Sequence, residues 1–164
     1  MARPQKETVD YFPHDASASD GATLSIIQHQ FGNDGYAFWF RLLEILARTR
    51  GHVIDCRNPA TLEFLQAKTH VEADLAEKLL QKLADLGAID TELWAIRVIW
   101  CQNLVNRVAD VYKNRRNPIP LKPTTYTPKP TSAPVSTTDN PIHAPVSTTD
   151  NTQTKLKETK LKET

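Results

Sequence analysis

Residues 58–87, NPATLEFLQAKTHVEADLAEKLLQKLADLG, decide the fold. Asn58 followed by Pro59 predicts a helix start, because the amide side chain can cap free backbone N–H groups and proline fits the first helical turn. The helical pattern breaks at residues 69–71, resumes with four leucines at helical spacing and ends at Gly87. Two helices joined by about three residues predict a helix-turn-helix.

Two helices and a strand are predicted upstream of this pair. Asp20 can cap a first helix, which Gly32 ends. After a turn at residues 33–35, residues 36–48 are apolar over most of the helical circumference, which is typical of a buried central helix. Residues 53–54 lie in a segment too short for a helix, so we expect a short strand there.

A β-hairpin and a last helix are predicted downstream. Residues 88–90 and 93–96 are short apolar segments on either side of an acidic turn, which favours a hairpin that would form a wing. Residues 101–112 then place apolar side chains on one face of a helix that ends before Pro118. The expected fold class is therefore mainly α, an α+β winged helix: a helix-turn-helix with a short β-hairpin wing plus N- and C-terminal helices.

The N-terminal residues are expected to be ordered. Tyr11 and Phe12 place two aromatic side chains next to Pro13, and burial of a Phe-sized group stabilises a fold by about 1.5–3 kcal/mol. We therefore expect the first fourteen residues to dock against the body.

The composition divides the chain after residue 117. Eight of the 11 prolines follow this position, whereas 11 of the 12 aromatic side chains precede it. Residues 133–140, APVSTTDN, recur at 144–151, and such Thr- and Pro-rich sequence buries too little apolar surface to offset chain entropy. We expect a winged-helix domain at residues 1–117 and a low-complexity, disordered tail with short repeats at residues 118–164.

The charge is split along the chain, although the total is only +1. Residues 1–96 carry 9 basic and 14 acidic side chains, whereas residues 97–117 carry five basic and one acidic. A basic stretch after an acidic body indicates a polyanionic partner, although a solvated helix face would have the same composition. The main candidates for phosphate contacts are Arg107, Lys113, Arg115 and Arg116.

The second helix of the helix-turn-helix is acidic, which disfavours base reading. It exposes four acidic side chains against two lysines, so its N-terminal turn would meet phosphate repulsion in a major groove. Side chains in and near the turn can still contact phosphates. The remaining DNA-binding candidates are Lys68, Thr69, His70, Lys78, Gln81, Lys82, Arg3 and Lys6.

Catalytic, metal and membrane functions have no motif to support them. The sequence lacks a phosphate-binding glycine loop, a Gly-x-Ser-x-Gly and a His-Glu-x-x-His. Two cysteines are too few for a disulfide framework, and His52 and Cys56 lack the partners that a zinc site needs. No apolar run reaches the length of a membrane span or forms a signal segment. We expect no enzyme activity, metal, cofactor, small-molecule substrate or membrane contact, and a cytoplasmic location in a bacterium or phage-infected host.

Four pieces of the sequence resemble a domain of phage and prophage replication proteins. They are ARPQKETVDYFPHD at 2–15, the segment at 31–37, the helix at 58–68 and LADLGAI at 83–89. Over residues 2–117 the chain is similar to the DnaD-like replisome organisers. The resemblance implies a winged helix that acts in replication initiation by binding DNA, by self-association or by recruiting helicase-loading or replisome proteins.

Two functions stay open at this point. The first is a DNA-binding winged-helix protein of phage or prophage type that acts in replication initiation, mainly through phosphate contacts of basic residues. The alternative is a protein–protein interaction or oligomerisation module without direct DNA readout, with the acidic second helix as its contact surface. Fold alone does not separate them, whereas the salt dependence of DNA affinity does, because its slope reports the number of phosphate contacts.

Overall fold

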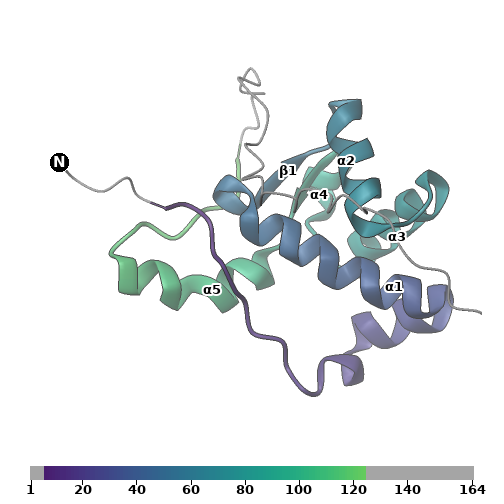
Figure 1. Ribbon diagram of the computed structural model, residues 1–164, viewed down its shortest axis with the longest axis horizontal. Coiled ribbons are helices and arrows are strands. Elements are labelled where there is room, and N and C mark those ends of the chain that lie inside the picture. Colours follow the sequence, from purple (N-terminus) through teal and green to yellow (C-terminus); the bar gives the residue numbers. More distant parts are fainter. Residues whose placement is uncertain (1–5, 125–164) are drawn as a thin grey trace, which may run out of the picture. The chain divides into compact units, whose positions relative to one another are not determined.

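Helices dominate the computed structural model, which describes residues 6–124 of the chain (Figure 1). The mainly α class expected from the sequence is confirmed, together with one small sheet. Short 3₁₀ helices at Ala18–Asp20 and Arg50–His52 precede α1 and β1. The elements follow in the order α1 (Ala22–Arg48), β1 (Val53–Asp55), α2 (Pro59–Thr69), α3 (Ala73–Asp85), α4 (Thr91–Ala95), β2 (Val98–Trp100) and α5 (Gln102–Arg115).

The predicted helix pair is confirmed in α2 and α3. The Asn58 side chain caps α2 by accepting a hydrogen bond from the N–H of Ala60 at 3.0 Å. His70 ends α2 in the left-handed conformation, with a φ of 56°, and Gly87 follows α3 with a φ of 66°. Both helices pack against α1, so the pair is held by its apolar side.

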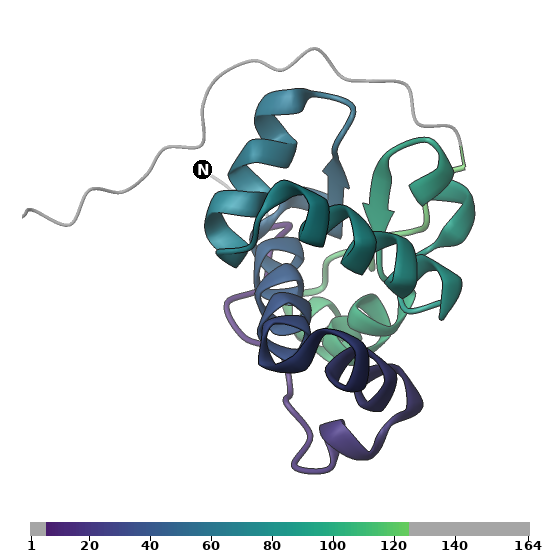
Figure 2. The ribbon, with the colours of Figure 1, turned by 90° about the vertical axis from the view of Figure 1, so that its right-hand side faces the viewer.

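α1 folds back on itself at Gly32, where φ is 63° and ψ is −150° (Figure 2). The predicted helix end is correct, but the predicted turn at residues 33–35 is wrong, because helical backbone resumes immediately after Gly32. Gly35 is buried where the two limbs of α1 meet. A Cβ atom there would lie 2.7 Å from Cγ2 of Ile27 and 2.9 Å from its carbonyl oxygen. Glycine is therefore required for the close approach of the limbs.

The sheet joins two segments that are far apart in the sequence. β1 confirms the predicted strand at residues 53–54, and its antiparallel partner is β2, with Val53 opposite Trp100 and Asp55 opposite Val98. All three residues of β2 are buried. Because α2, α3 and α4 lie between the strands in the sequence, the pairing of β1 with β2 brings together the two ends of the segment that contains the helix pair.

The hairpin predicted at residues 88–96 is wrong, because residues 91–95 form α4. The Asp90 carboxylate accepts a hydrogen bond from the N–H of Leu93 at 3.0 Å and so caps this short helix. One helical turn also buries both Leu93 and Trp94, which an alternating strand would place on opposite faces. The expected wing is therefore absent from these residues.

The described residues before α1 are docked, as expected, whereas residues 1–5 of the predicted segment lie outside the described residues. We define the N-terminal segment as residues 6–15; it runs between α1 and α5 (Figure 1). Val9 is buried and its N–H donates to the carbonyl oxygen of Ala47 at 2.9 Å. Phe12 packs against the core. Tyr11 does not, since 71% of its surface is exposed, so the expected burial is correct for one aromatic ring and wrong for the other.

A buried polar chain links the N-terminal segment to the core. His52 is fully buried, with Nδ1 2.9 Å from the carbonyl oxygen of Leu46 and Nε2 2.7 Å from Oη of Tyr112. Oη of Tyr112 also lies 2.9 Å from the carbonyl oxygen of Glu7, to which it donates. Burial lowers the pKa of His52, because the charged imidazolium loses its hydration there, although the hydrogen bond to Leu46 opposes this shift.

The described residues beyond α5 still contact the body. Ile119 packs against the core, and Nζ of Lys122 lies 2.7 Å from Asp90 and 3.0 Å from Glu92. The division after residue 117 and the disordered tail stay predictions, since the repeats lie outside the described residues.

Candidate nucleic-acid interface

Arg107 and Lys113 project from the solvent side of α5, and Arg116 follows its last turn. Arg107 forms an ion pair of 2.6 Å with Asp15 of the N-terminal segment, and both side chains are 48% exposed. Lys113 pairs with Asp110, one turn away on the same helix, at 3.0 Å. Arg116 is exposed and forms no ion pair with another described residue. These three candidates are therefore accessible to phosphate.

Arg115 has a structural task that the sequence did not reveal. Its Nη1 donates to the carbonyl oxygen of Thr8 at 2.7 Å, and its Nη2 lies 3.7 Å from the carboxylate of Asp10. Lys6, another candidate, also binds Asp10, at 2.5 Å. Arg115 fastens the N-terminal segment to α5, so its loss would disturb the fold as well as any DNA contact, whereas the Lys6–Asp10 pair lies within the segment.

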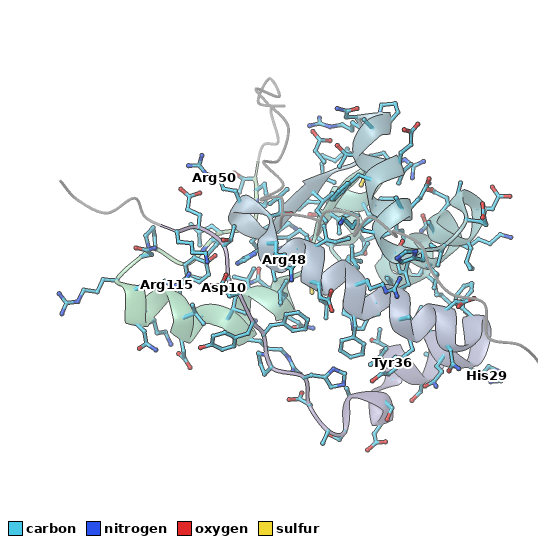
Figure 3. The ribbon with its side chains drawn as sticks, viewed as in Figure 1. Asp10, His29, Tyr36, Arg48, Arg50 and Arg115 are labelled. Atoms are coloured by element: carbon cyan, nitrogen blue, oxygen red, sulfur yellow. The ribbon has the colours of Figure 1, made fainter. Side chains whose placement is uncertain are left out.

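Two further arginines lie on the same surface and were not predicted from the sequence: Arg48, the last residue of α1, and Arg50, in the 3₁₀ helix that follows. Figure 3 shows Arg48 and Arg115 on opposite sides of Asp10, with Arg50 close to the same segment. Arg50 binds the carboxylate of Glu7 through two nitrogens. The hydrogen bond from Lys6 lowers the pKa of Asp10, and the positive charges of Arg115 and Arg48 act in the same direction.

We call these four side chains along the N-terminal segment the arginine border: Arg48, Arg50, Arg107 and Arg115. They come from the C-terminal end of α1 (Ala22–Arg48), the 3₁₀ helix after it (Arg50–His52) and α5 (Gln102–Arg115), so the first two elements lie far from the third in the sequence. Sequence spacing alone therefore could not group them. The basic composition of residues 97–117 was the available signal in the sequence.

A cleft of about 330 Å³ opens between the N-terminal segment and α1. His14 stacks on Phe40 inside it, with ring centroids 4.1 Å apart and planes inclined by 16°. Its Nε2 is also 3.2 Å from Oη of Tyr36. Tyr11 lines the cleft while remaining largely exposed, and Arg48 lines it from α1. The cleft thus combines aromatic rings with one arginine.

The candidates in the helix-turn-helix turn differ in what they can contact. Thr69 is buried, and its hydroxyl donates to the carbonyl oxygen of Leu65 at 2.8 Å, so its side chain is not available for phosphate. Lys68 is exposed and lies over the ring of Phe64, 5.5 Å from the centroid. His70 is exposed at the end of α2. Of these three candidates, only Lys68 and His70 can reach a phosphate.

On α3, Gln81 is occupied by structural contacts. Its Nε2 donates to Asp85 at 2.8 Å, and its Oε1 accepts from Nε1 of Trp94 at 3.1 Å. Lys78 is exposed and Lys82 is half-buried. The acidic character of this helix is confirmed at the surface, because Glu72 and Asp74 are exposed and form no ion pair with another described residue.

The candidates therefore fall into two separate groups. α5 lies on one side of α1, and α2 with α3 lies on the other (Figures 1 and 2). The structure brings Arg107 and Arg115 to the N-terminal segment, which carries Lys6, and leaves the candidates on α2 and α3 elsewhere. Arg3 lies outside the described residues.

Other kinds of site find little support in the described part of the chain. It holds no group of three or more side chains that could bind a metal ion. Cys56 and Cys101 are buried, and burial raises the pKa of Cys56 to about 12, which keeps this thiol protonated. None of the helices in residues 6–124 has the length and apolar character needed to cross a bilayer.

Comparison with known proteins gives one match. Residues 11–104 match the family described as Lin1244/Lin1753-like, N-terminal, which is of phage and prophage type. The matched range extends from Tyr11 in the N-terminal segment to the first turn of α5. No curated protein and no solved structure matches the chain.

Proposed function

Because this chain belongs to the Lin1244/Lin1753-like family through its N-terminal domain, we propose that it binds DNA in the initiation of phage or prophage replication. The replication role is supported by the resemblance to DnaD-like replisome organisers in residues 2–15 and 83–89. In this proposal the fold is a winged-helix variant in which α4 takes the place of the hairpin.

The observation that carries the proposal is the cluster of arginines and lysines along α5 and the N-terminal segment. Arg107 and Lys113 are paired with surface carboxylates, and such exposed ion pairs contribute only about 0–1 kcal/mol. A DNA phosphate can therefore replace Asp15 on Arg107 at little cost. Phosphate contacts supply most of the sequence-independent affinity for DNA.

The acidic helix α3 is not the DNA-contacting element in this proposal. Glu72 and Asp74 stand at its N-terminal turn, where a DNA-reading helix approaches the bases. Two carboxylates there would repel the phosphates on both sides of a groove. DNA accordingly lies against α5 in this proposal.

Duplex affinity measured at several salt concentrations tests the proposal. The test variant replaces Arg107, Lys113 and Arg116 with alanine and keeps Arg115, which fastens the N-terminal segment. Each phosphate contact adds about 0.9 to the salt slope on duplex DNA, so loss of three contacts should lower the slope by about 2–3 and weaken binding. The matched control replaces Lys78 and Lys82 with alanine and should change the slope little. Wild-type slope in the test variant, or no binding by the natural sequence at low salt, would refute the proposal.

A second candidate function, a protein-interaction module, has one observation in its favour. Phe64 is 46% exposed on α2, and its sequence neighbour Glu63 lines a shallow hollow together with Glu72. An exposed aromatic ring with acidic neighbours suits a basic protein partner or self-association. Phe64→Ala would then abolish oligomers or partner binding while DNA affinity stays constant, which light scattering and the DNA assay distinguish.

A further inference from the structure

We infer that the cleft beside Tyr11 binds an unpaired base of single-stranded DNA. This inference rests on the proposed function and makes it more specific, because it assigns the N-terminal segment a preference for unpaired strands. Tyr11 supplies the ring on which the base stacks. The arginine border holds the phosphates on either side of it.

The first argument is the exposure of Tyr11 beside a preformed cleft. At 71% it is the most exposed aromatic side chain among the described residues, although the next residue, Phe12, packs against the core. The cleft of about 330 Å³ beside it already holds His14 stacked on Phe40. A base that enters therefore meets aromatic surfaces. Because these side chains are already in place, binding costs little conformational entropy of the protein. A base inside a duplex has both faces covered by its neighbours and cannot stack there.

The second argument is the position of the arginines relative to this ring. Arg115 reaches Asp10 and Arg107 reaches Asp15, so the two side chains bracket residues 11–14. They are eight residues apart on α5, which is about 12 Å along the helix axis. Cations that follow the backbone, with aromatic rings between them, are the combination found in sites for single-stranded nucleic acids.

The third argument is the mixture of charges inside the cleft. Arg48 lines it together with the carboxylates of Asp10 and Glu44. The carboxylate of Asp10 is already bound by Lys6, whereas that of Glu44 repels a phosphate that would enter the cleft and can accept a hydrogen bond from the amino group of a base edge. In this arrangement the phosphates contact the arginine border, and the base enters the cleft.

The test compares a short mixed-sequence single strand with the duplex of the same sequence, by fluorescence anisotropy with the full chain at low salt. Tyr11→Ala should weaken binding to the single strand by at least about fivefold, because stacking on one aromatic side chain is lost. Tyr11→Phe keeps the ring and should bind as the natural sequence does. Phe64→Ala removes an exposed ring from α2 and should leave both affinities unchanged. Thermal melts confirm that each variant is folded.

The outcomes separate this inference from the proposed function. If Tyr11→Ala leaves single-strand affinity unchanged, or weakens both kinds of DNA equally, the base site is refuted while duplex binding through α5 stands. If Tyr11→Phe loses as much affinity as Tyr11→Ala, the hydroxyl and not the ring makes the contact, and stacking is refuted. If the natural sequence binds neither DNA, the proposed function fails and the base site fails with it.

Discussion

The α2–α3 pair and the N-terminal segment with α5 are held in the body by different kinds of contact. The pair presents fully buried leucines to the core, such as Leu79 and Leu83. The segment buries Val9 and part of Phe12 and is otherwise fastened by hydrogen bonds and ion pairs. The comparison shows that apolar packing holds the helix pair, whereas mainly polar contacts hold the surface that we propose for DNA. Three substitutions and one pH profile test that contrast.

The largest effect is expected from the apolar side. Leu79→Ala removes a fully buried side chain from α3 and should lower the free energy of unfolding by about 2–5 kcal/mol, because it leaves a cavity. Urea denaturation measures the change. Lys78→Ala, at the next position on the solvent side, should change it by less than about 0.5 kcal/mol. Similar values for the two variants would show that α3 is not held by its apolar face.

A smaller effect is expected from the polar chain under the N-terminal segment. Tyr112→Phe removes the hydroxyl between His52 and Glu7 and leaves buried hydrogen-bonding groups without their partner. The cost should be about 1–3 kcal/mol. The matched control is Tyr36→Phe, whose hydroxyl meets His14 at the surface. If both variants unfold at the same urea concentration, the buried chain does not contribute to stability.

The pH dependence of stability should reveal the buried imidazole. The pKa of His52 in the folded protein lies below that of the unfolded chain, so only the unfolded state takes up a proton as the pH falls below about 6.5. Stability should therefore be complete above this pH and fall by up to about 1.4 kcal/mol per pH unit below it. Thermal melts between neutral and mildly acidic pH measure the slope. Replacing exposed His29 with Gln should leave it unchanged, whereas a flat profile in the natural sequence would contradict the lowered pKa.

The smallest effect concerns the competition between carboxylates and phosphate. Asp15→Asn frees Arg107, so duplex affinity should rise by about two- to fivefold, while stability changes little because the pair is half exposed. Asp34→Asn changes the net charge equally but lies at an exposed position in α1. It should raise affinity less. Equal gains would mean that total charge, and not Arg107, controls the affinity.

The helix pair was predictable because its signals are local. Asn58 with Pro59 and the glycine at position 87 fix its ends within a few residues of the apolar pattern. The hairpin was mispredicted because residues 88–96 carry two conflicting signals, short apolar segments and an Asp90 cap. The cap determines the structure there. The run Val98–Trp100 was a usable strand signal, since three consecutive buried apolar residues are typical of a covered strand.

The candidate site was only partly predictable. The basic end of α5 follows from composition, but the partners of Arg107 and Arg115 lie about a hundred residues earlier and no periodicity connects them. The structural roles of Arg115 and Gln81 depend on tertiary contacts to a backbone carbonyl and an indole N–H. The sequence alone does not distinguish a side chain that binds another part of the same chain from one that is free to bind a ligand.

The contacts that fasten the N-terminal segment also determine when, during synthesis, this segment can reach its final place. Its backbone carbonyls are bound by Tyr112, Arg115 and Asn117, at sequence separations of 105, 107 and 111 residues. A ribosome extends a chain at about 5–20 residues per second, so the segment waits several seconds for these partners. Meanwhile the helix pair can form as soon as its own residues emerge. The N-terminal segment is thus synthesised well before its partners and is among the last of the described residues to reach its final place, so Tyr11 takes up its position only when α5 has formed.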